Sequence, residues 1–143
     1  MSDGLQFEIV TNNPRLTADF AASHGVVFIH GVEGSPLDVV DRAEELLQQG
    51  RELISAPLPP NIPLMRAPYR SLLLALSEKR YDAQGLLSLA KARERLTTQR
   101  EIDADDPSQG LSGRGEDFAL IDEDLLCRAL RDCRLCLEAN GRE

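Results

Sequence analysis

Short apolar runs alternate with amphipathic segments along the first half of the chain. Residues 5–10, 26–29 and 52–55 are short and apolar or β-branched, as expected of strands. Residues 14–23 and 35–50 carry apolar side chains at helical spacing. Strands that alternate with helices usually form a parallel sheet with right-handed crossovers. The order therefore predicts an α/β protein: a Rossmann-like three-layer sandwich around a small, mainly parallel sheet of about four strands.

Local signals set the ends of these elements. Asn13 before Pro14 predicts a helix start, because proline is tolerated in the first turn and asparagine caps well. Ser35 and Asp38 form a variant capping box, and Gly50 predicts the helix end. The run at 26–29 lies between two glycines, which is typical of a strand buried on both faces.

The second half is less regular. A proline-rich stretch precedes residues 69–77, whose apolar run lacks a clean period; we favour a strand there over a buried helix. Residues 81–100 predict a helix with Asp82 as N-cap, and residues 122–139 a final helix capped by Asp122. Between them, residues 101–117 are polar and acidic, which predicts a flexible surface loop. At 143 residues, the whole of 1–143 is expected to form a single domain.

The charge distribution limits the partners. The net charge is −8, and residues 101–124 hold nine acidic residues and one basic residue, so the remainder is neutral overall. This pattern lacks the basic surface of a nucleic-acid-binding protein. No apolar run approaches the roughly 20 residues of a membrane span, and the N-terminus does not resemble a secretion signal. We expect no nucleic acid and no membrane as partners, and a cytoplasmic location.

Ligands of open parallel sheets lie outside the carboxyl ends of the strands. The segments expected at that edge are residues 11–13, 30–35, 55–57 and 77–78. The ligand-binding candidates among them and in the proline-rich stretch are Thr11, Asn12, Asn13, Gly34, Ser35 and Tyr69, with Arg66 as a further cover. A helix start at Gly34-Ser35 suits an anion, so a small anionic ligand is expected. The same residues are good caps, and capping alone also explains them.

Two other groups of residues have side chains that could catalyse a reaction or bind a metal. His30 and Glu33 could form an acid–base pair, which would make the chain a small enzyme, although no third partner is evident. The cysteines are Cys127, Cys133 and Cys136. Their odd number disfavours disulfides, and Leu126, Leu130 and Cys133 share a helical face, so core packing is favoured over redox chemistry or zinc. We expect no metal, no cofactor and no catalytic residue.

Four stretches occur in the order and approximate spacing of the GrdX family: "IVTNNP", "VEGSPLDVV", "GRELISAPL" and "APYRSLLL". The chain resembles this family over roughly residues 6–96, with a weaker likeness in "FALIDEDLL". The most specific pieces are the Thr-Asn-Asn-Pro turn and the turn formed by residues 68–71. Members of the family are small proteins encoded beside glycine, sarcosine or betaine reductase genes.

The resemblance implies an accessory role near the reductase system, with a reductase-system protein as a partner, and no activity that can be assigned residue by residue. The preferred interpretation is a non-enzymatic, small-ligand-binding or accessory protein. The alternatives are the His30–Glu33 enzyme and a self-associating partner protein. The last would form a homodimer through the leucines of residues 72–76, which are more apolar than one strand requires.

Overall fold

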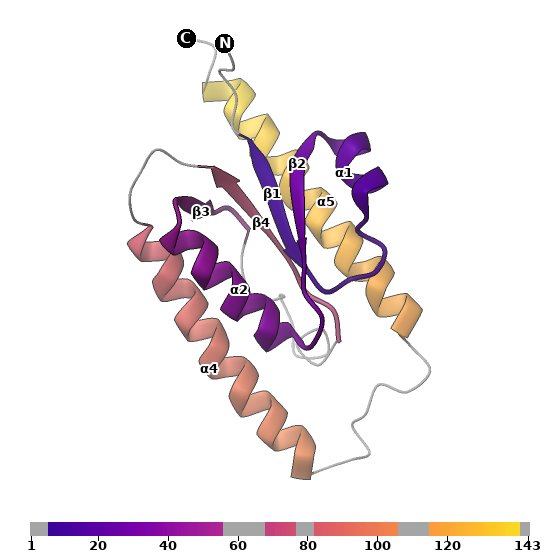
Figure 1. The fold of residues 1–143 in the computed structure, drawn as a ribbon, viewed down its shortest axis with the longest axis vertical. Coiled ribbons are helices and arrows are strands. Elements are labelled where there is room, and N and C mark those ends of the chain that lie inside the picture. Colours follow the sequence, from indigo (N-terminus) through magenta and orange to yellow (C-terminus); the bar gives the residue numbers. More distant parts are fainter. Residues whose placement is uncertain (1–5, 56–67, 77–81, 106–114, 141–143) are drawn as a thin grey trace.

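The computed structural model describes residues 6–55, 68–76, 82–105 and 115–140. Its elements are β1 (Phe7–Thr11), α1 (Ala18–His24), β2 (Val26–Gly31), α2 (Pro36–Gln48), β3 (Arg51–Leu53), β4 (Ser71–Leu76), α4 (Ala83–Asp105) and α5 (Gly115–Asn140). The strands form one four-stranded sheet in the order β2-β1-β4-β3 (Figure 1). The α/β class is thus confirmed, and residues 69–77 do contain a strand.

The sheet is mixed, so the prediction of a mainly parallel sheet is wrong. β1 and β2 are parallel, whereas β4 is antiparallel to both of its neighbours, β1 and β3. A parallel neighbour requires a long crossover, usually through a helix. β4 instead pairs antiparallel with β1 and β3, an arrangement that the expected alternation of strands and helices did not predict. The reversal of β4 also means that the Rossmann-like topology is not confirmed.

Helices cover both faces of the sheet, which Figure 1 shows with α2 and α4 on one side and α5 on the other. The first core joins β1 and β4 to α2 and α4, and its fully buried members include Val10, Leu72 and Leu89. The second core joins β1, β2 and β4 to α1 and α5, and includes Ile9 and Leu73. Successive side chains of a strand point to opposite faces, so the central strands β1 and β4 supply both cores.

The leucine-rich run is explained by this central position. Leu72, Leu73 and Leu74 are fully buried inside the chain. They are therefore not available as a surface for self-association, and the homodimer expected from them has no support. Residues 26–29 were expected to form a strand buried on both faces, and this prediction is wrong. They lie in the edge strand β2, where Phe28 is 54% exposed.

Capping explains where the helices begin. At α2 the predicted capping box between Ser35 and Asp38 is present, and Gly50 follows the helix end with a φ of 99°. At α1 the prediction was wrong, because Thr17 rather than Asn13 is the N-cap and accepts from the Phe20 amide. Asp82 accepts from the Gly85 amide, as expected of an N-cap of α4.

The acidic segment was also placed incorrectly. α4 continues to Asp105 and α5 begins at Gly115, so only residues 106–114 of the expected loop lie outside the described residues. Glu116 and Asp117 occupy the first turn of α5, where acidic side chains complement the helix dipole. Asp122 is therefore an interior helical residue rather than a cap. No helix in the described ranges has the length and apolarity needed to cross a bilayer.

Candidate functional site

The carboxyl ends of β1 and β2 lie at one edge of the sheet and flank an open hollow. Its volume is about 320 Å³. Its lining comprises Thr11, Asn12, Asn13, Pro14, Leu16, Gly31, Val32 and Glu33. Three of the six predicted ligand-binding residues therefore line it, whereas Gly34, Ser35 and Tyr69 do not. Arg66 and the expected strand end at 77–78 lie outside the described residues.

Because β4 is antiparallel, its beginning rather than its end meets this edge. Thr11, the last residue of β1, pairs with Ser71, the first residue of β4. Arg70 and Ser71 are thus brought to the edge that residues 77–78 were expected to occupy. The error in strand direction accounts for this difference completely.

The Asn12 side chain holds three segments together at the edge. Its Nδ2 donates to the carbonyls of Gly34 at 2.9 Å and Pro68 at 2.8 Å, and its Oδ1 accepts from the Arg70 amide at 2.8 Å. Both amide donors and the acceptor are therefore engaged within the protein. Asn12 acts as a structural clamp between the ends of β1 and β2 and the beginning of β4.

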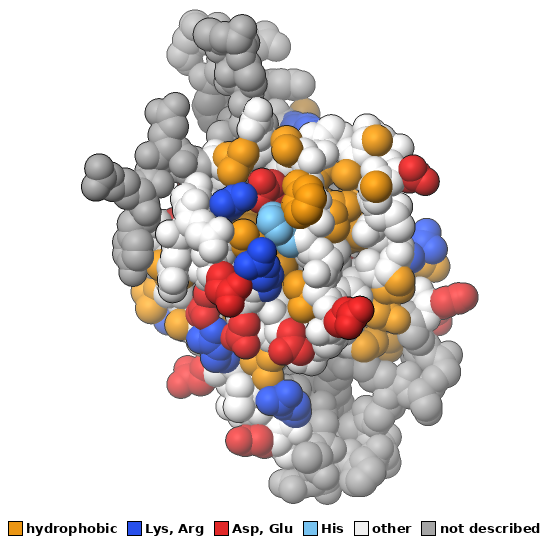
Figure 2. Space-filling view, viewed as in Figure 1, with side chains coloured by type: hydrophobic (Ala, Val, Ile, Leu, Met, Phe, Trp, Pro, Cys, Tyr) orange, Lys and Arg blue, Asp and Glu red, His pale blue; other side chains and the backbone are white. Residues whose placement is uncertain are grey.

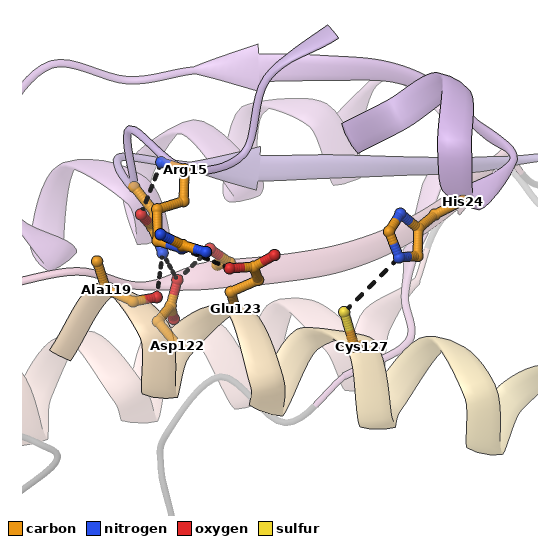
Figure 3. Close-up of polar contacts among 8 residues, drawn as sticks. Arg15, His24, Ala119, Asp122, Glu123 and Cys127 are labelled. Carbon is orange, nitrogen blue, oxygen red and sulfur yellow. Dashed lines mark hydrogen bonds and ion pairs between the residues drawn. The ribbon is translucent and has the colours of Figure 1, made fainter. Parts of the chain in front are cut away.

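Asn13 forms a second, more deeply buried clamp onto α5. It is 3% exposed. Its Nδ2 donates to the Ala119 carbonyl at 2.9 Å and to Asp122 Oδ2 at 3.0 Å, and its Oδ1 accepts from the Arg15 amide at 3.0 Å. Figure 3 shows Ala119 and Asp122 of α5 on one side of these contacts and Arg15 on the other. The Leu16 amide also donates to the Asn13 carbonyl at 3.1 Å, so residues 13–16 form a turn that precedes the start of α1 at Ala18.

The hydroxyl groups of Thr11 and Ser71 continue this hydrogen-bond network between the sheet edge and α5. Ser71 Oγ donates to Asp122 Oδ2 at 2.5 Å, and Thr11 Oγ1 lies 2.6 Å from Ser71 Oγ. Burial raises the pKa of Asp122, while the hydrogen bonds from Ser71 and Asn13 and the charge of Arg70 act in the opposite direction. Sequence reasoning assigned Asp122 to a cap and so missed this polar centre.

The start of α2 carries its own negative charge. Asp38 Oδ2 accepts from the Ser35 amide at 2.8 Å and lies 3.2 Å from Ser35 Oγ. A side chain added to Gly34 would also meet this carboxylate. An anion bound at Gly34-Ser35 would therefore compete with Asp38 for the same donors.

His30 belongs to a different cluster from the one predicted. Its Nε2 lies 2.8 Å from Glu8 Oε1, and Arg51 Nε lies 3.1 Å from the same oxygen. Glu33 instead lines the hollow, and His30 is not part of that lining. The predicted His30–Glu33 pair is thus not formed. On the face viewed in Figure 2, a histidine lies among basic, acidic and apolar side chains.

Two opposing effects act on the Glu8 carboxyl. Burial would raise its pKa, but the hydrogen bonds and charges of Arg51 and His30 together outweigh burial, so its pKa lies below the ordinary 4.5. The unfolded chain therefore takes up a proton at this position before the folded chain does. The stability that Glu8 contributes is complete above about pH 4.5 and is lost as the pH falls through the lower, folded value.

This difference gives a testable pH dependence. Replacing Glu8 with glutamine is expected to lower the free energy of unfolding by about 2 kcal/mol at pH 7, since a buried charged acceptor is lost. The gap to the wild type should narrow at about pH 3, where Glu8 is increasingly protonated in both states. Urea unfolding at the two pH values measures the difference in free energy of unfolding between the variant and the wild type. Glu94→Gln, at an exposed position, is the control. A gap that stays constant with pH would contradict the assigned role.

Two of the three cysteine side chains lie within the described part of the chain. The Cys127 and Cys133 side chains pack against the second core. Cys127 Sγ lies 4.0 Å from His24 Nε2 (Figure 3), but burial, with the charges of Glu123 and Asp124, raises the pKa of the thiol. A raised pKa disfavours the nucleophilic thiolate. No group of three or more metal-ligating side chains occurs among the described residues, and the Cys136 side chain lies outside them.

The fold and this edge define a small α/β protein with a mixed four-stranded sheet and polar clamps at the carboxyl ends of β1 and β2. A family model described as GrdX-like protein matches residues 8–131. The chain therefore belongs to the GrdX-like family. Comparison with curated proteins finds no match, and neither does comparison with solved structures.

Proposed function

We propose that this chain is a non-enzymatic accessory protein that binds a small polar molecule in the hollow at the ends of β1 and β2. The observation that carries the proposal is the hollow itself. Its volume of about 320 Å³ suits a small ligand. The clamps made by Asn12 and Asn13 hold its walls before a ligand arrives, which reduces the entropic cost of binding.

The lining argues for the chemistry of the ligand. The polar atoms of Asn12 and Asn13 are already engaged, and Thr11 Oγ1 accepts from the Asn13 amide at 2.9 Å. Glu33 is the ionisable residue in the lining, and it is exposed. A ligand with a positively charged amino group would place that group against the Glu33 carboxylate. We therefore favour a small amino compound over the simple anion expected from the sequence.

Membership of the GrdX-like family supports the wider proposal of an accessory role beside the amino-acid reductase system. The genes of the family that the chain resembles stand beside reductase genes, so the amino compounds handled there are the first ligands to examine. Glycine, sarcosine and betaine differ in the methylation of one nitrogen. They therefore probe the size and hydrogen bonding of the proposed amino-group position.

A thermal-shift screen of these three compounds, with acetyl phosphate, phosphate and nucleotides, tests the proposal. A ligand at about tenfold its Kd should raise the melting temperature by roughly 4 °C. Gly31→Val is the blocking variant. Gly31 pairs with Thr11 in the sheet, lacks a positive φ, and has open space where a Cβ would lie. The added side chain would enter the hollow without straining the backbone.

The control is Ala22→Val, which introduces the same side chain at an exposed position of α1. The proposal predicts a shift that Ala22→Val keeps and Gly31→Val abolishes while both variants stay folded. A shift that survives in Gly31→Val would move the ligand elsewhere on the protein. No shift with any compound would remove the support for a small-ligand role and favour a protein partner.

A further inference from the structure

Arg70 is buried at the edge of the sheet without a matching partner. The residue is 6% exposed, and its Nε and Nη2 atoms have no hydrogen-bond partner within the described ranges. Within those ranges it also forms no ion pair within 4.0 Å. Buried donors are nearly always satisfied in folded proteins, and an unsatisfied charged donor is the most costly kind. The two free atoms therefore call for a partner that the described residues do not supply.

The two unpartnered atoms are adjacent on the guanidinium. Nε and Nη2 lie on one side of the planar group, and together they present two parallel N–H bonds. This edge matches the two oxygens of a carboxylate or phosphate, which it binds in a bidentate manner. One water oxygen can accept from both donors only with bent hydrogen bonds, whereas two coplanar oxygens can each accept along one N–H bond.

Backbone hydrogen bonds fix Arg70 in place, so the Nε–Nη2 edge of its guanidinium is not needed to hold the residue. Its amide donates to Asn12 Oδ1 at 2.8 Å, and its carbonyl accepts from the Asn12 amide at 3.4 Å. The following residue, Ser71, is fixed to Thr11 and Asp122. The side chain thus starts from a rigid point, as expected of a receptor group that is organised before its ligand binds.

Asp122 does not fill the role of partner. Its charge acts on Arg70 through space, and burial lowers the pKa of the guanidinium more than that charge raises it. The Asp122 Oδ2 atom is already engaged by Ser71 and Asn13. The negative charge of Asp122 would instead limit the total charge that can be bound beside it, which favours a monoanion.

We propose that the Nε–Nη2 edge of Arg70 is a binding position for a small monoanion with two coplanar oxygens, a carboxylate or a singly charged phosphate group. Arg70 belongs to the Pro-Tyr-Arg-Ser segment that leads into β4, and Asn12 holds the backbone of this segment at Pro68 and Arg70. The position is separate from the lining of the hollow, which does not include Arg70. It therefore stands whether or not the hollow binds an amino compound.

The test compares acetate and phosphate with chloride at matched ionic strength. Arg70→Lys keeps the charge and removes the paired donors, and Arg15→Lys is the control because Arg15 is exposed and paired with Glu123 at 2.5 Å. At about tenfold its Kd, acetate or phosphate should raise the melting temperature of the wild type and of Arg15→Lys by roughly 4 °C beyond chloride. Arg70→Lys should lose this rise. An equal rise in all three proteins, or none in the wild type, would overturn the proposal.

Two further measurements keep the test decisive. If Arg70→Lys does not fold, the Nε–H resonance of Arg70 is followed in the wild type labelled with ¹⁵N-arginine. A saturable shift of that resonance with acetate or phosphate supports the proposal, and an unmoved resonance refutes it. Gly31→Val should retain the anion response; its loss there would assign the anion to the hollow, so that this proposal fails while a ligand in the hollow stands.

Discussion

Replacing Leu73 with alanine is expected to lower the free energy of unfolding by about 3 kcal/mol. Leu73 is fully buried in the central strand β4, where it joins the core formed with α1 and α5. The substitution removes apolar surface and leaves a cavity that rigid strands on both sides cannot close. Urea unfolding followed by circular dichroism measures the loss.

The matched control is Leu87→Ala, the same substitution at an exposed position of α4. It should change the free energy of unfolding by no more than about 0.5 kcal/mol. Equal effects of the two substitutions would contradict the central position of β4. They would reopen the possibility that its leucines face a partner chain.

Replacing Asn13 with alanine is expected to cost about 2–3 kcal/mol. The Ala119 carbonyl and the Asp122 carboxylate both lose a donor, and Asp122 is a half-buried carboxylate whose pKa burial already raises. Loss of a donor to the ionised form should raise that pKa further. Chemical unfolding gives the energy, and the carboxyl ¹³C resonance of Asp122 gives the change in pKa.

Arg15→Met provides the contrast for Asn13→Ala. It removes the ion pair between Arg15 and Glu123, which joins the same two segments, the turn after β1 and α5. Arg15 is exposed, so this pair is expected to contribute less than about 1 kcal/mol. If Arg15→Met proved the more damaging of the two, the buried amide would not be the clamp described above.

The sequence predicted the elements better than their arrangement. β-Branched and apolar runs located β1, β2 and β4, and the capping pattern at Ser35 located the start of α2. These signals are local, so they survive in the folded chain. The direction of β4 depends on how the chain returns after β3, and no local propensity encodes it. For this reason the sheet was expected to be mainly parallel and is mixed.

The candidate site follows the same division. Thr11, Asn12 and Asn13 were placed at the edge correctly, because β1 and β2 are parallel as expected. Arg70 and Asp122 were missed, since the first depends on the reversal of β4 and the second on the packing of α5. The Glu8 cluster was not predicted either. An acidic residue within an apolar strand needs a buried partner, and this signal was not used to search for His30 and Arg51.

A ¹H–¹⁵N chemical-shift titration of the wild-type protein with the most stabilising compound of the thermal-shift screen tests the ligand-binding claim most directly. We expect saturable shifts of the amides of Thr11, Gly31 and Glu33, with little change for residues of α4. Saturable shifts confined to another part of the chain, or no shifts at any concentration, would contradict it.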